Sequence, residues 1–152
     1  MRRGNTRSHS ELGSQALLRR WYFVLRHGRV GHCQAKQILM KNKIVVTGGA
    51  GFVGSNLIEY LIKKTKFKII SLDNYSSGSV KNHIRSSRVK YIKGNTAKIS
   101  HILYSERKKI HSIFHFGEFS RIYQSFSKLS QCLDSNSIGT NSVFKFSLEN
   151  KI

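Results

Sequence analysis

The strongest structural signal in this chain is the stretch Lys43-Ile-Val-Val-Thr-Gly-Gly-Ala-Gly-Phe-Val-Gly54. It begins with a short run of β-branched residues, which is typical of a buried strand, and Gly48-Gly49 ends that run. After Gly51 the apolar residues recur at steps of three and four, from Val53 to Ile62, which predicts a helix with one apolar face. The sequence therefore predicts a strand and a helix joined by a glycine-rich loop.

The spacing of the glycines in this loop fits a binding site for a pyrophosphate. Gly48 permits a tight turn out of the strand, Gly51 lets the backbone approach a phosphate, and Gly54 lets the helix pack closely on the sheet. The amides and the positive dipole at the start of the helix then hold the anion. The loop lacks the Gly-Lys-Ser/Thr ending of a nucleoside-triphosphate loop, so it favours a dinucleotide.

An acidic residue follows the second predicted strand at the spacing that dinucleotide-binding proteins use. That strand runs from Phe67 to Leu72, and Asp73 comes 19 residues after Gly54. A carboxylate in this place accepts hydrogen bonds from ribose hydroxyls and repels a 2′-phosphate, which favours NAD over NADP. The alternative interpretation is that the glycines are ordinary turn residues and that Asp73 caps a loop.

The rest of residues 40–152 alternates between predicted strands and helices. Further strands are expected over 89–93 and 111–116, a loop over 73–81, and helices over 97–109 and 130–149. Strands that alternate with helices form a parallel sheet through right-handed crossovers. We therefore expect an α/β fold, a Rossmann-type doubly wound parallel sheet that is truncated after about four strands.

These motifs resemble those of a known family. Residues 41–152 resemble the extended short-chain dehydrogenases/reductases, and within them the NAD-dependent epimerase/dehydratase family, whose best-known member is UDP-glucose 4-epimerase. The family's Thr-Gly-x-x-Gly-x-x-Gly loop is matched by Thr47–Gly54. Its Asp-Asn-x-Ser-x-Gly stretch is matched by Asp73–Gly78, and its Asn-x-x-Gly-Thr motif by Asn136–Thr140.

The resemblance also implies which residues bind the cofactor NAD. Asp73 is expected to bind the adenosine ribose, Asn74 to lie against the adenine, and Asn136 to support the active site through the helix backbone and water. The candidate cofactor-binding residues are Gly48, Gly51, Phe52, Val53, Gly54, Asp73, Asn74, Ser76, Ser77, Gly78, Asn95, Thr96, Phe116, Gly117, Glu118 and Asn136.

Two positions depart from the family's pattern. The family has Gly-Asp after its third strand, near the adenine amino group, whereas this chain has Gly94-Asn95 and loses the charge. The family's fourth strand ends in His-x-Ala-Ala or His-x-Ala-Gly, whereas this chain has His115-Phe-Gly-Glu118. Three interpretations of Glu118 stay open: it reads the sugar, it pairs with Arg121, or it reflects drift in a decaying copy.

The family's catalytic residues are not found in their expected places. The family uses a Ser or Thr and a Tyr-x-x-x-Lys pair, in which the Lys helps the Tyr phenolate to take a proton from a sugar hydroxyl. Two matches occur here, Tyr60–Lys64 and Tyr104–Lys108, but on the helices expected after the first and third strands rather than after a fifth. We interpret both as helix-surface residues, and we predict no catalytic residue and no metal site in this chain.

The first 39 residues differ in composition from the rest. They hold seven Arg, one Lys and one acidic residue, whereas residues 40–152 hold fifteen Lys and four Arg. They show no sustained period of a strand or a helix. We expect a disordered basic extension, or an upstream segment translated ahead of a true start at Met40. A transit peptide and a nucleic-acid-binding arm are the alternatives.

The net charge of the chain is +20, and residues 40–152 alone carry nineteen basic and six acidic residues. Positive charge favours polyanions, but these Lys residues are scattered over expected helix ends and loops, so nucleic acid is the least favoured partner. Two cysteines and no long apolar segment favour a cytoplasmic protein without a membrane span.

These observations favour the NAD-binding portion of a nucleotide-sugar epimerase/dehydratase, not catalytically competent alone. A non-catalytic NAD-binding or interaction module is the alternative, and a basic nucleic-acid-binding protein is a weaker one. The resemblance implies NAD and a nucleotide sugar as ligands. It also implies a homodimer in the family, which this chain is less expected to form.

Overall fold

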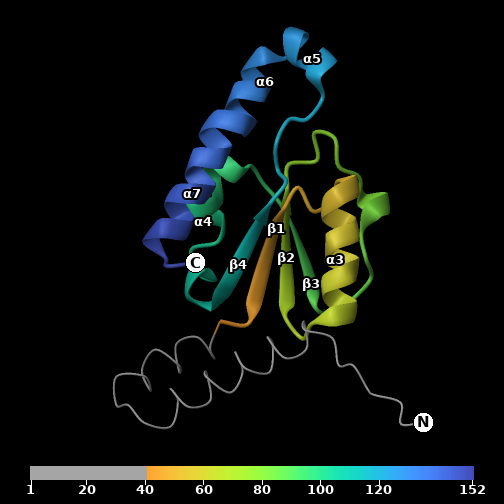
Figure 1. The fold of residues 1–152 in the computed structure, drawn as a ribbon, viewed down its shortest axis with the longest axis vertical. Coiled ribbons are helices and arrows are strands. Elements are labelled where there is room, and N and C mark those ends of the chain that lie inside the picture. Colours follow the sequence, from red (N-terminus) through yellow and green to blue (C-terminus); the bar gives the residue numbers. More distant parts are fainter. Residues whose placement is uncertain (1–40) are drawn as a thin grey trace, which may run out of the picture. The chain divides into compact units, whose positions relative to one another are not determined.

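The fold is built around a sheet of four parallel strands. The computed structural model describes residues 41–152, so our expectations for residues 1–39 lie outside the described residues. The strands, in the spatial order β3-β2-β1-β4 (Figure 1), are β1 (Lys43–Thr47), β2 (Lys68–Asp73), β3 (Val89–Lys93) and β4 (Ile110–His115). Each forms within one residue of its predicted bounds, and the predicted α/β fold with a parallel sheet is confirmed.

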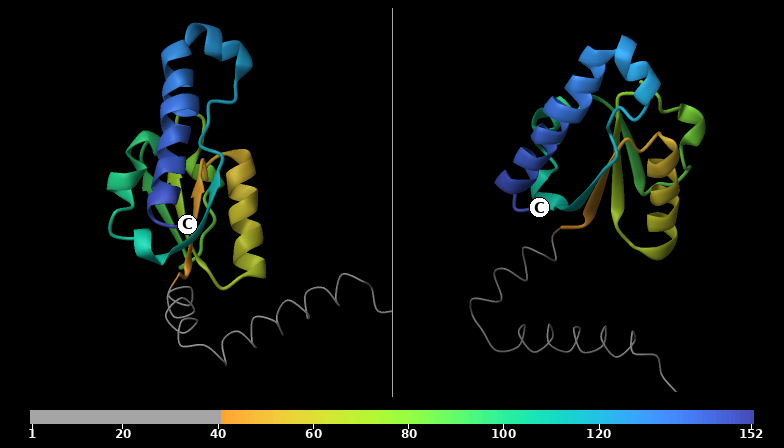
Figure 2. Two further views of the ribbon diagram at one scale, coloured as in Figure 1. Left: turned by 60° about the vertical axis from the view of Figure 1, so that its left-hand side comes forward. Right: turned by 45° about the horizontal axis from the view of Figure 1, so that its top comes forward.

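Helices cover both faces of this sheet, as the doubly wound prediction requires. α3 (Phe52–Lys64) lies on one face, and α4 (Ile99–Ile102) and α7 (Thr140–Glu149) lie on the other (Figures 1 and 2). The buried core under α3 consists of Ile44, Val46, Ile58, Leu61 and Ile69. The buried core on the opposite face consists of Val45, Ile70, Leu72, Ile99, Leu103, Ile110, Val143 and Phe146.

The alternation of side chains along β1 supplies both cores. Ile44 and Val46 belong to the core under α3, whereas Val45 belongs to the core on the opposite face. All three are almost fully buried, as expected for a central parallel strand that is covered on both faces. Burial of each such side chain contributes about 1.5–3 kcal/mol, so β1 anchors the whole sheet.

The carboxyl ends of three strands meet at one edge of the sheet. Thr47 at the end of β1 pairs with Leu72 in β2 and with His115 in β4. From β1 the chain adds β2 and then β3 on one side of β1. It then crosses to the other side of β1 and adds β4 there. This reversal creates a crevice outside the strand ends, which is where open parallel sheets bind their ligands.

The segment predicted as a helix over 97–109 is not one continuous helix. Besides α4 and a turn, it consists of two 3-10 turns, η2 (Thr96–Lys98) and η3 (Arg107–Lys109). The apolar residues that reach the core end at Leu103, and Glu106 then pairs with Lys43 at 2.5 Å. The hydrogen bond from Lys43 holds the pKa of the Glu106 carboxyl below its usual range. This ion pair fixes the turn that replaces the second half of the expected helix.

The long helix predicted over 130–149 forms over that extent but contains an irregular turn. It consists of α6 (Leu129–Leu133), a π-helical segment η4 (Asp134–Gly139) and α7. Two further elements, which the apolar pattern does not predict, are α5 (Ile122–Ser127) and a 3-10 turn η1 (Val80–Asn82). Within residues 41–152, no helix has the length and apolar character needed to cross a membrane.

Candidate functional site

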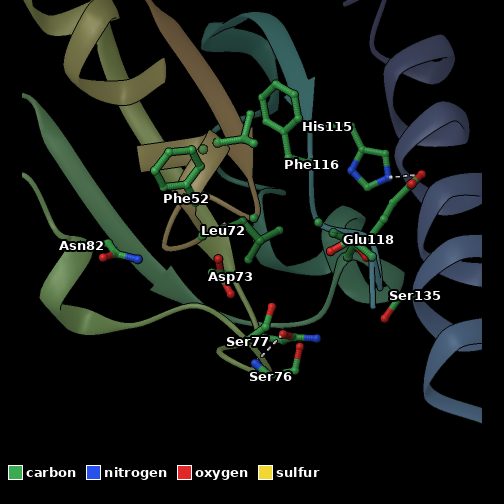
Figure 3. Close-up of a pocket in the computed structure, with 18 of the residues that line it drawn as sticks. Phe52, Leu72, Asp73, Ser76, Ser77, Asn82, His115, Phe116, Glu118 and Ser135 are labelled. Carbon is green, nitrogen blue, oxygen red and sulfur yellow. Dashed lines mark hydrogen bonds and ion pairs between the residues drawn. The ribbon is translucent and has the colours of Figure 1, made fainter. Parts of the chain in front are cut away.

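A cavity of about 530 Å³ lies in the crevice at the carboxyl ends of the strands. Its wall comes from the glycine loop and the start of α3, the loop after β2, the segment after β4, and η4. Figure 3 shows Asp73 on one side of the cavity and Glu118, with His115, on the side of the helical segments. The cavity therefore spans the ends of β2, β1 and β4.

Two glycines make the loop after β1 possible. Gly48 has a φ of +68°, and a Cβ there would lie 2.5 Å from the carbonyl oxygen of Phe116. A Cβ on Gly54 would lie 2.3 Å from the carbonyl oxygen of Gly48. The Gly48 amide donates to the Leu72 carbonyl at 2.8 Å, which ties the loop to β2. Any side chain at Gly48 or Gly54 would force the loop out of this shape.

The start of α3 faces the cavity with its first amides uncapped. Gly51 is the N-cap residue, and no side chain accepts a hydrogen bond from the first turn. Gly51, Phe52, Val53 and Gly54 all line the cavity, and the first turn contains no acidic residue. Because the first amides of a helix lack partners within the helix and the dipole is positive there, this end of α3 can hold an anion.

Asp73 lies at the end of β2 with its carboxylate in the cavity wall (Figure 3). Only 7% of the residue is exposed. Its Oδ2 accepts a hydrogen bond from the Ala50 amide and its Oδ1 accepts one from the Tyr75 amide, both at 2.8 Å. Each carboxylate oxygen has a second acceptor position. Asp73 can therefore hold the protein backbone and accept hydrogen bonds from ligand hydroxyls at the same time.

The loop after β2 is fastened to the glycine loop through the Ala50 peptide group. The Ala50 carbonyl accepts hydrogen bonds from the Ser79 amide at 3.0 Å and from Asn82 Nδ2 at 2.8 Å. Gly78 belongs to the same contact, because a Cβ there would lie 3.0 Å from Asp73 Oδ2. The two loops form one connected wall of the cavity.

Three aromatic side chains support the outer side of this wall. The Tyr75 hydroxyl lies 2.9 Å from His83 Nε2, and the His83 ring stacks on Tyr91 at a centroid distance of 3.7 Å. The Tyr91 hydroxyl accepts a hydrogen bond from the Ile84 amide at 2.8 Å. Burial raises the pKa of both tyrosines, and the charge of Asp73 adds to the shift at Tyr75. Both hydroxyls therefore keep their protons near neutral pH.

His115, at the end of β4, lies between two threonine hydroxyls. Its Nδ1 is 2.6 Å from Thr47 Oγ1 and its Nε2 is 3.0 Å from Thr140 Oγ1. Burial lowers the pKa of the imidazole, and the carboxylate of Glu118 partly opposes this shift. His115 is therefore neutral at pH 7, and it connects β1, β4 and α7.

The Asn136–Thr140 motif holds the helical segment against the cavity. Asn136 Oδ1 accepts a hydrogen bond from the Phe119 amide at 2.6 Å, and Asn136 Nδ2 donates to the Phe119 carbonyl at 3.0 Å. Gly139 permits a close approach to η2, because a Cβ there would lie 2.3 Å from Thr96 Oγ1. The motif thus fixes both the segment after β4 and the position of η4.

The sequence of this region matches a described family. The model of the "NAD dependent epimerase/dehydratase family" matches residues 44–152, which include all of the sheet but the first residue of β1, and all of the cavity lining. The chain belongs to this family. The predicted resemblance is thereby confirmed.

Relatives in the epimerase/dehydratase family are longer than this chain. The dTDP-D-glucose 4,6-dehydratase of Dictyostelium discoideum is 35% identical over 113 residues, which is 70% of this chain and 26% of that protein. The UDP-glucose 4-epimerase of Thermotoga maritima, solved with UDP-glucose, superposes with a TM-score of 0.64 at 26% identity and covers 72% of this chain and 35% of its own. The Thermus thermophilus UDP-glucose 4-epimerase, solved with NAD, shares the fold at 19% identity, with a TM-score of 0.63 and coverage of 72% and 35%. The chain spans about a quarter to a third of the length of these relatives.

Most residues predicted from the family's motifs line the cavity. The thirteen that do are Gly48, Gly51, Phe52, Val53, Gly54, Asp73, Asn74, Ser76, Ser77, Thr96, Phe116, Gly117 and Glu118. Gly78, Asn95 and Asn136 do not line it. Gly78 and Asn136 make the supporting contacts described above. Asn95 Oδ1 accepts a hydrogen bond from the Ala97 amide at 2.9 Å and caps η2, so its contact with adenine stays a prediction.

Other residues line the cavity without having been singled out for it. They are Leu72, Asn82, Gly94, His115, Ser120, Arg121 and Ser135. The strand predicted over 111–116 contains His115 but does not place it at a site, although the family's His-x-Ala motif carries a signal for it. Asn82 reaches the cavity because the loop after β2 folds back on Ala50, and no local pattern reveals such a contact.

Glu118 lines the cavity but does not pair with Arg121. Its Oε1 accepts a hydrogen bond from Thr140 Oγ1 at 3.1 Å and lies 3.9 Å from His115 Nε2. Within residues 41–152, Arg121 has no ion-pair partner. The interpretation of Glu118 as the partner of Arg121 is therefore wrong, because Thr140 and His115 hold the carboxylate on the side of α7.

Neither Tyr-x-x-x-Lys match contributes to the cavity wall. Tyr60 lies on α3 and is largely exposed. Tyr104 is also largely exposed and lies in the turn after α4, with the Arg107 guanidinium 3.8 Å from its ring centroid. The interpretation of both tyrosines as surface residues is confirmed, although Tyr104 lies in a turn and not in the expected helix.

Proposed function

We propose that this chain is the NAD-binding portion of a nucleotide-sugar epimerase/dehydratase and does not catalyse the reaction by itself. The observation that carries the proposal is the juxtaposition of Asp73 with the uncapped start of α3 across the glycine loop. A hydroxyl acceptor beside the glycine loop and an anion site where that loop enters α3 are what an adenosine diphosphate group needs.

The residues present fit the dinucleotide. The glycine loop leaves room for phosphate oxygens, because Gly51 has no side chain between the backbone and the cavity. Asp73 would accept hydrogen bonds from the adenosine ribose, and the first amides of α3 would donate to the pyrophosphate. When bound, NAD supplies a hydride acceptor for a sugar carbon. The carboxylate of Asp73 would repel a 2′-phosphate, which favours NAD over NADP.

The proposal leaves catalysis to residues outside the described cavity. Tyr60 and Tyr104, which have a Lys four residues later, lie away from the cavity wall. The substrate class, a nucleotide sugar, comes from the family and its relatives, such as the Thermotoga maritima enzyme solved with UDP-glucose. A cytoplasmic location is proposed with it, on the basis of the cysteine content alone.

A second candidate function is a non-catalytic NAD-binding module. The exposed apolar side chains of α5, Ile122, Tyr123 and Phe126, favour it, because exposed apolar surface is common where proteins associate. Both functions require NAD binding. They differ in whether a sugar nucleotide is turned over once the remaining family residues are supplied on a second chain.

The binding claim is tested by calorimetric titration of the full chain with NAD and with NADP. We expect binding of NAD in the micromolar range and an affinity for NADP that is at least about tenfold lower. Asp73→Ala should remove most of the binding and the preference, whereas Asp134→Ala, which removes the same charge outside the cavity, should change neither. Equal affinities for NAD and NADP, unaffected by Asp73→Ala, would contradict the proposal.

A further inference from the structure

Glu118 departs from the small residues that the family places after its fourth strand, and the structure shows what holds it. Its Oε1 accepts a hydrogen bond from Thr140 Oγ1 at 3.1 Å. That same hydroxyl oxygen lies 3.0 Å from His115 Nε2, and His115 Nδ1 lies 2.6 Å from Thr47 Oγ1. A hydrogen-bonded series of four side chains therefore runs from the end of β1 to the carboxylate: Thr47, His115, Thr140 and Glu118.

Backbone amides around Thr47 indicate which group donates at each hydrogen bond of this series. Thr47 Oγ1 accepts the Gly117 amide at 3.1 Å and shares the Phe116 amide, which donates at 3.1 Å both to it and to the Thr47 carbonyl. With both amides on its acceptor side, we assign the hydroxyl proton of Thr47 to His115 Nδ1, which places the imidazole proton on Nε2. Nε2 donates to Thr140 Oγ1, and Thr140 in turn donates its hydroxyl proton to Glu118. Each partner has the role that the next one requires, so the Thr140 hydroxyl orients the carboxylate through Oε1.

The other oxygen of Glu118 has no partner within the part of the chain that the structure describes. Among residues 41–152, Glu118 Oε1 makes the contacts and Oε2 makes none. The side chain is 48% exposed and lines the cavity (Figure 3). A carboxylate oxygen that is held in place beside a cavity and lacks a protein partner is an acceptor for ligand donors.

The position of Glu118 places it opposite Asp73. Asp73 ends β2 and Glu118 follows β4, and β1 lies between these strands. A dinucleotide that puts its adenosine ribose at Asp73 and its pyrophosphate at α3 extends across β1 toward β4. The second ribose of the dinucleotide, which follows the pyrophosphate, and a sugar bound beyond it would therefore lie on the side of Glu118.

We propose that Glu118 is a specificity-determining residue that accepts hydrogen bonds from sugar hydroxyls at the β4 end of the cavity. The proposal rests on the proposed function, because it uses the direction in which the dinucleotide lies. Two ligands carry such hydroxyls there: the second ribose of the cofactor and the hexose of a nucleotide sugar. Both offer hydroxyl donors, which suit the Oε2 acceptor of Glu118.

The test compares each sugar-bearing ligand with the same ligand lacking the sugar. Calorimetry on the full chain measures ADP against ADP-ribose, and UDP against UDP-glucose, for the wild type and for Glu118→Gln. We expect Glu118→Gln to weaken ADP-ribose, UDP-glucose or both by about tenfold while ADP and UDP are unchanged. Loss with ADP-ribose assigns the ribose, and loss with UDP-glucose assigns the hexose.

Matched variants separate recognition from a structural effect. Thr140→Val should reproduce part of the loss, because it releases Oε1, and Thr140→Ser should restore it. Glu149→Gln, which removes the same charge at the far end of α7, should change no affinity. If Glu118→Gln changes none of the ratios, or weakens ADP as much as ADP-ribose, the role of Glu118 is overturned while the function stands. If the wild type binds none of the probes, both are overturned.

Discussion

The Asp73 carboxylate accepts a hydrogen bond from the Ala50 amide at 2.8 Å, so the acid at the end of β2 also holds the glycine loop after β1. Its second oxygen accepts the Tyr75 amide at the same distance. The residue proposed to bind the ribose is thus part of the framework that shapes the phosphate site. Loss of Asp73 should therefore affect stability as well as binding.

Asp73→Asn is expected to lower the free energy of unfolding by about 1–3 kcal/mol. The amide group can accept only one of the two backbone hydrogen bonds, and its NH2 group faces the other amide. Urea denaturation followed by circular dichroism measures the change. Asp134→Asn serves as the control, and it should shift the free energy by less than about 0.5 kcal/mol because its side chain is exposed. Equal stabilities of the wild type and Asp73→Asn would show that the two amides do not depend on the carboxylate.

Gly48 and Gly51 should respond differently to replacement by Ala. Gly48→Ala places a Cβ 2.5 Å from the Phe116 carbonyl oxygen at a φ of +68°, so we expect a loss of at least about 2 kcal/mol of stability. A Cβ on Gly51 meets only the Gly48 carbonyl oxygen, at 3.2 Å, and the backbone has an ordinary φ of −79°. Gly51→Ala should fold, but its methyl group should weaken NAD binding at least about tenfold. Thermal melts and calorimetry on both variants test this. A Gly51→Ala variant that binds NAD normally would show that the pyrophosphate does not bind at this loop.

The stability of the chain should fall as His115 is protonated. Burial lowers the pKa of His115 in the folded state, so below the unfolded value of about 6.5 the unfolded chain takes up a proton that the folded chain does not. This contribution is therefore present above that value and is lost as the pH falls below about 6.5 toward the lower pKa of the folded state. We expect the melting temperature to drop less over this range in His115→Gln than in the wild type. The exposed His101 provides the control, because His101→Gln should retain the wild-type drop. Parallel profiles for the wild type and His115→Gln would rule out a buried neutral imidazole.

Asn136 should act on the segment after β4 through both of its amide atoms. Asn136→Asp keeps the acceptor for the Phe119 amide but replaces the donor to the Phe119 carbonyl with an oxygen. We expect a loss of about 1–3 kcal/mol, because a partly buried carbonyl loses its partner and faces a charge. Asn141→Asp, one turn along on the exposed side of α7, should cost far less. If the two variants melt at the same temperature, the contact with Phe119 contributes nothing measurable.

Local patterns predict the strands and the glycine loop well, because each depends on neighbouring residues. The β-branched run before Gly48 is typical of a strand that is buried on both faces, as β1 is. The spacing from Gly54 to Asp73 corresponds to one helix and one strand. These features account for most of the cavity wall on the side of α3 and β2.

Contacts between distant segments account for what the patterns miss. The expected helix over 97–109 breaks where Glu106 pairs with Lys43, a residue 63 positions earlier. Glu118 turns to Thr140 and not to its near neighbour Arg121, because His115 and α7 are already in place. Asn82 joins the wall through Ala50, which lies in another loop. These contacts join residues that are far apart in the sequence, so they cannot be predicted before the fold is known.

NAD binding in this cavity is tested residue by residue when the isotope-labelled full chain is titrated with NAD and its amide chemical shifts are followed. We expect NAD to shift the amides of the glycine loop, of Asp73 and the residues that follow it, and of Phe116 to Glu118, while the amides of η3 stay unchanged. The same titration on Asp73→Ala should produce shifts only at much higher NAD concentration. Shifts that are absent, or that cluster on residues outside the cavity, would contradict the assignment of this cavity to NAD.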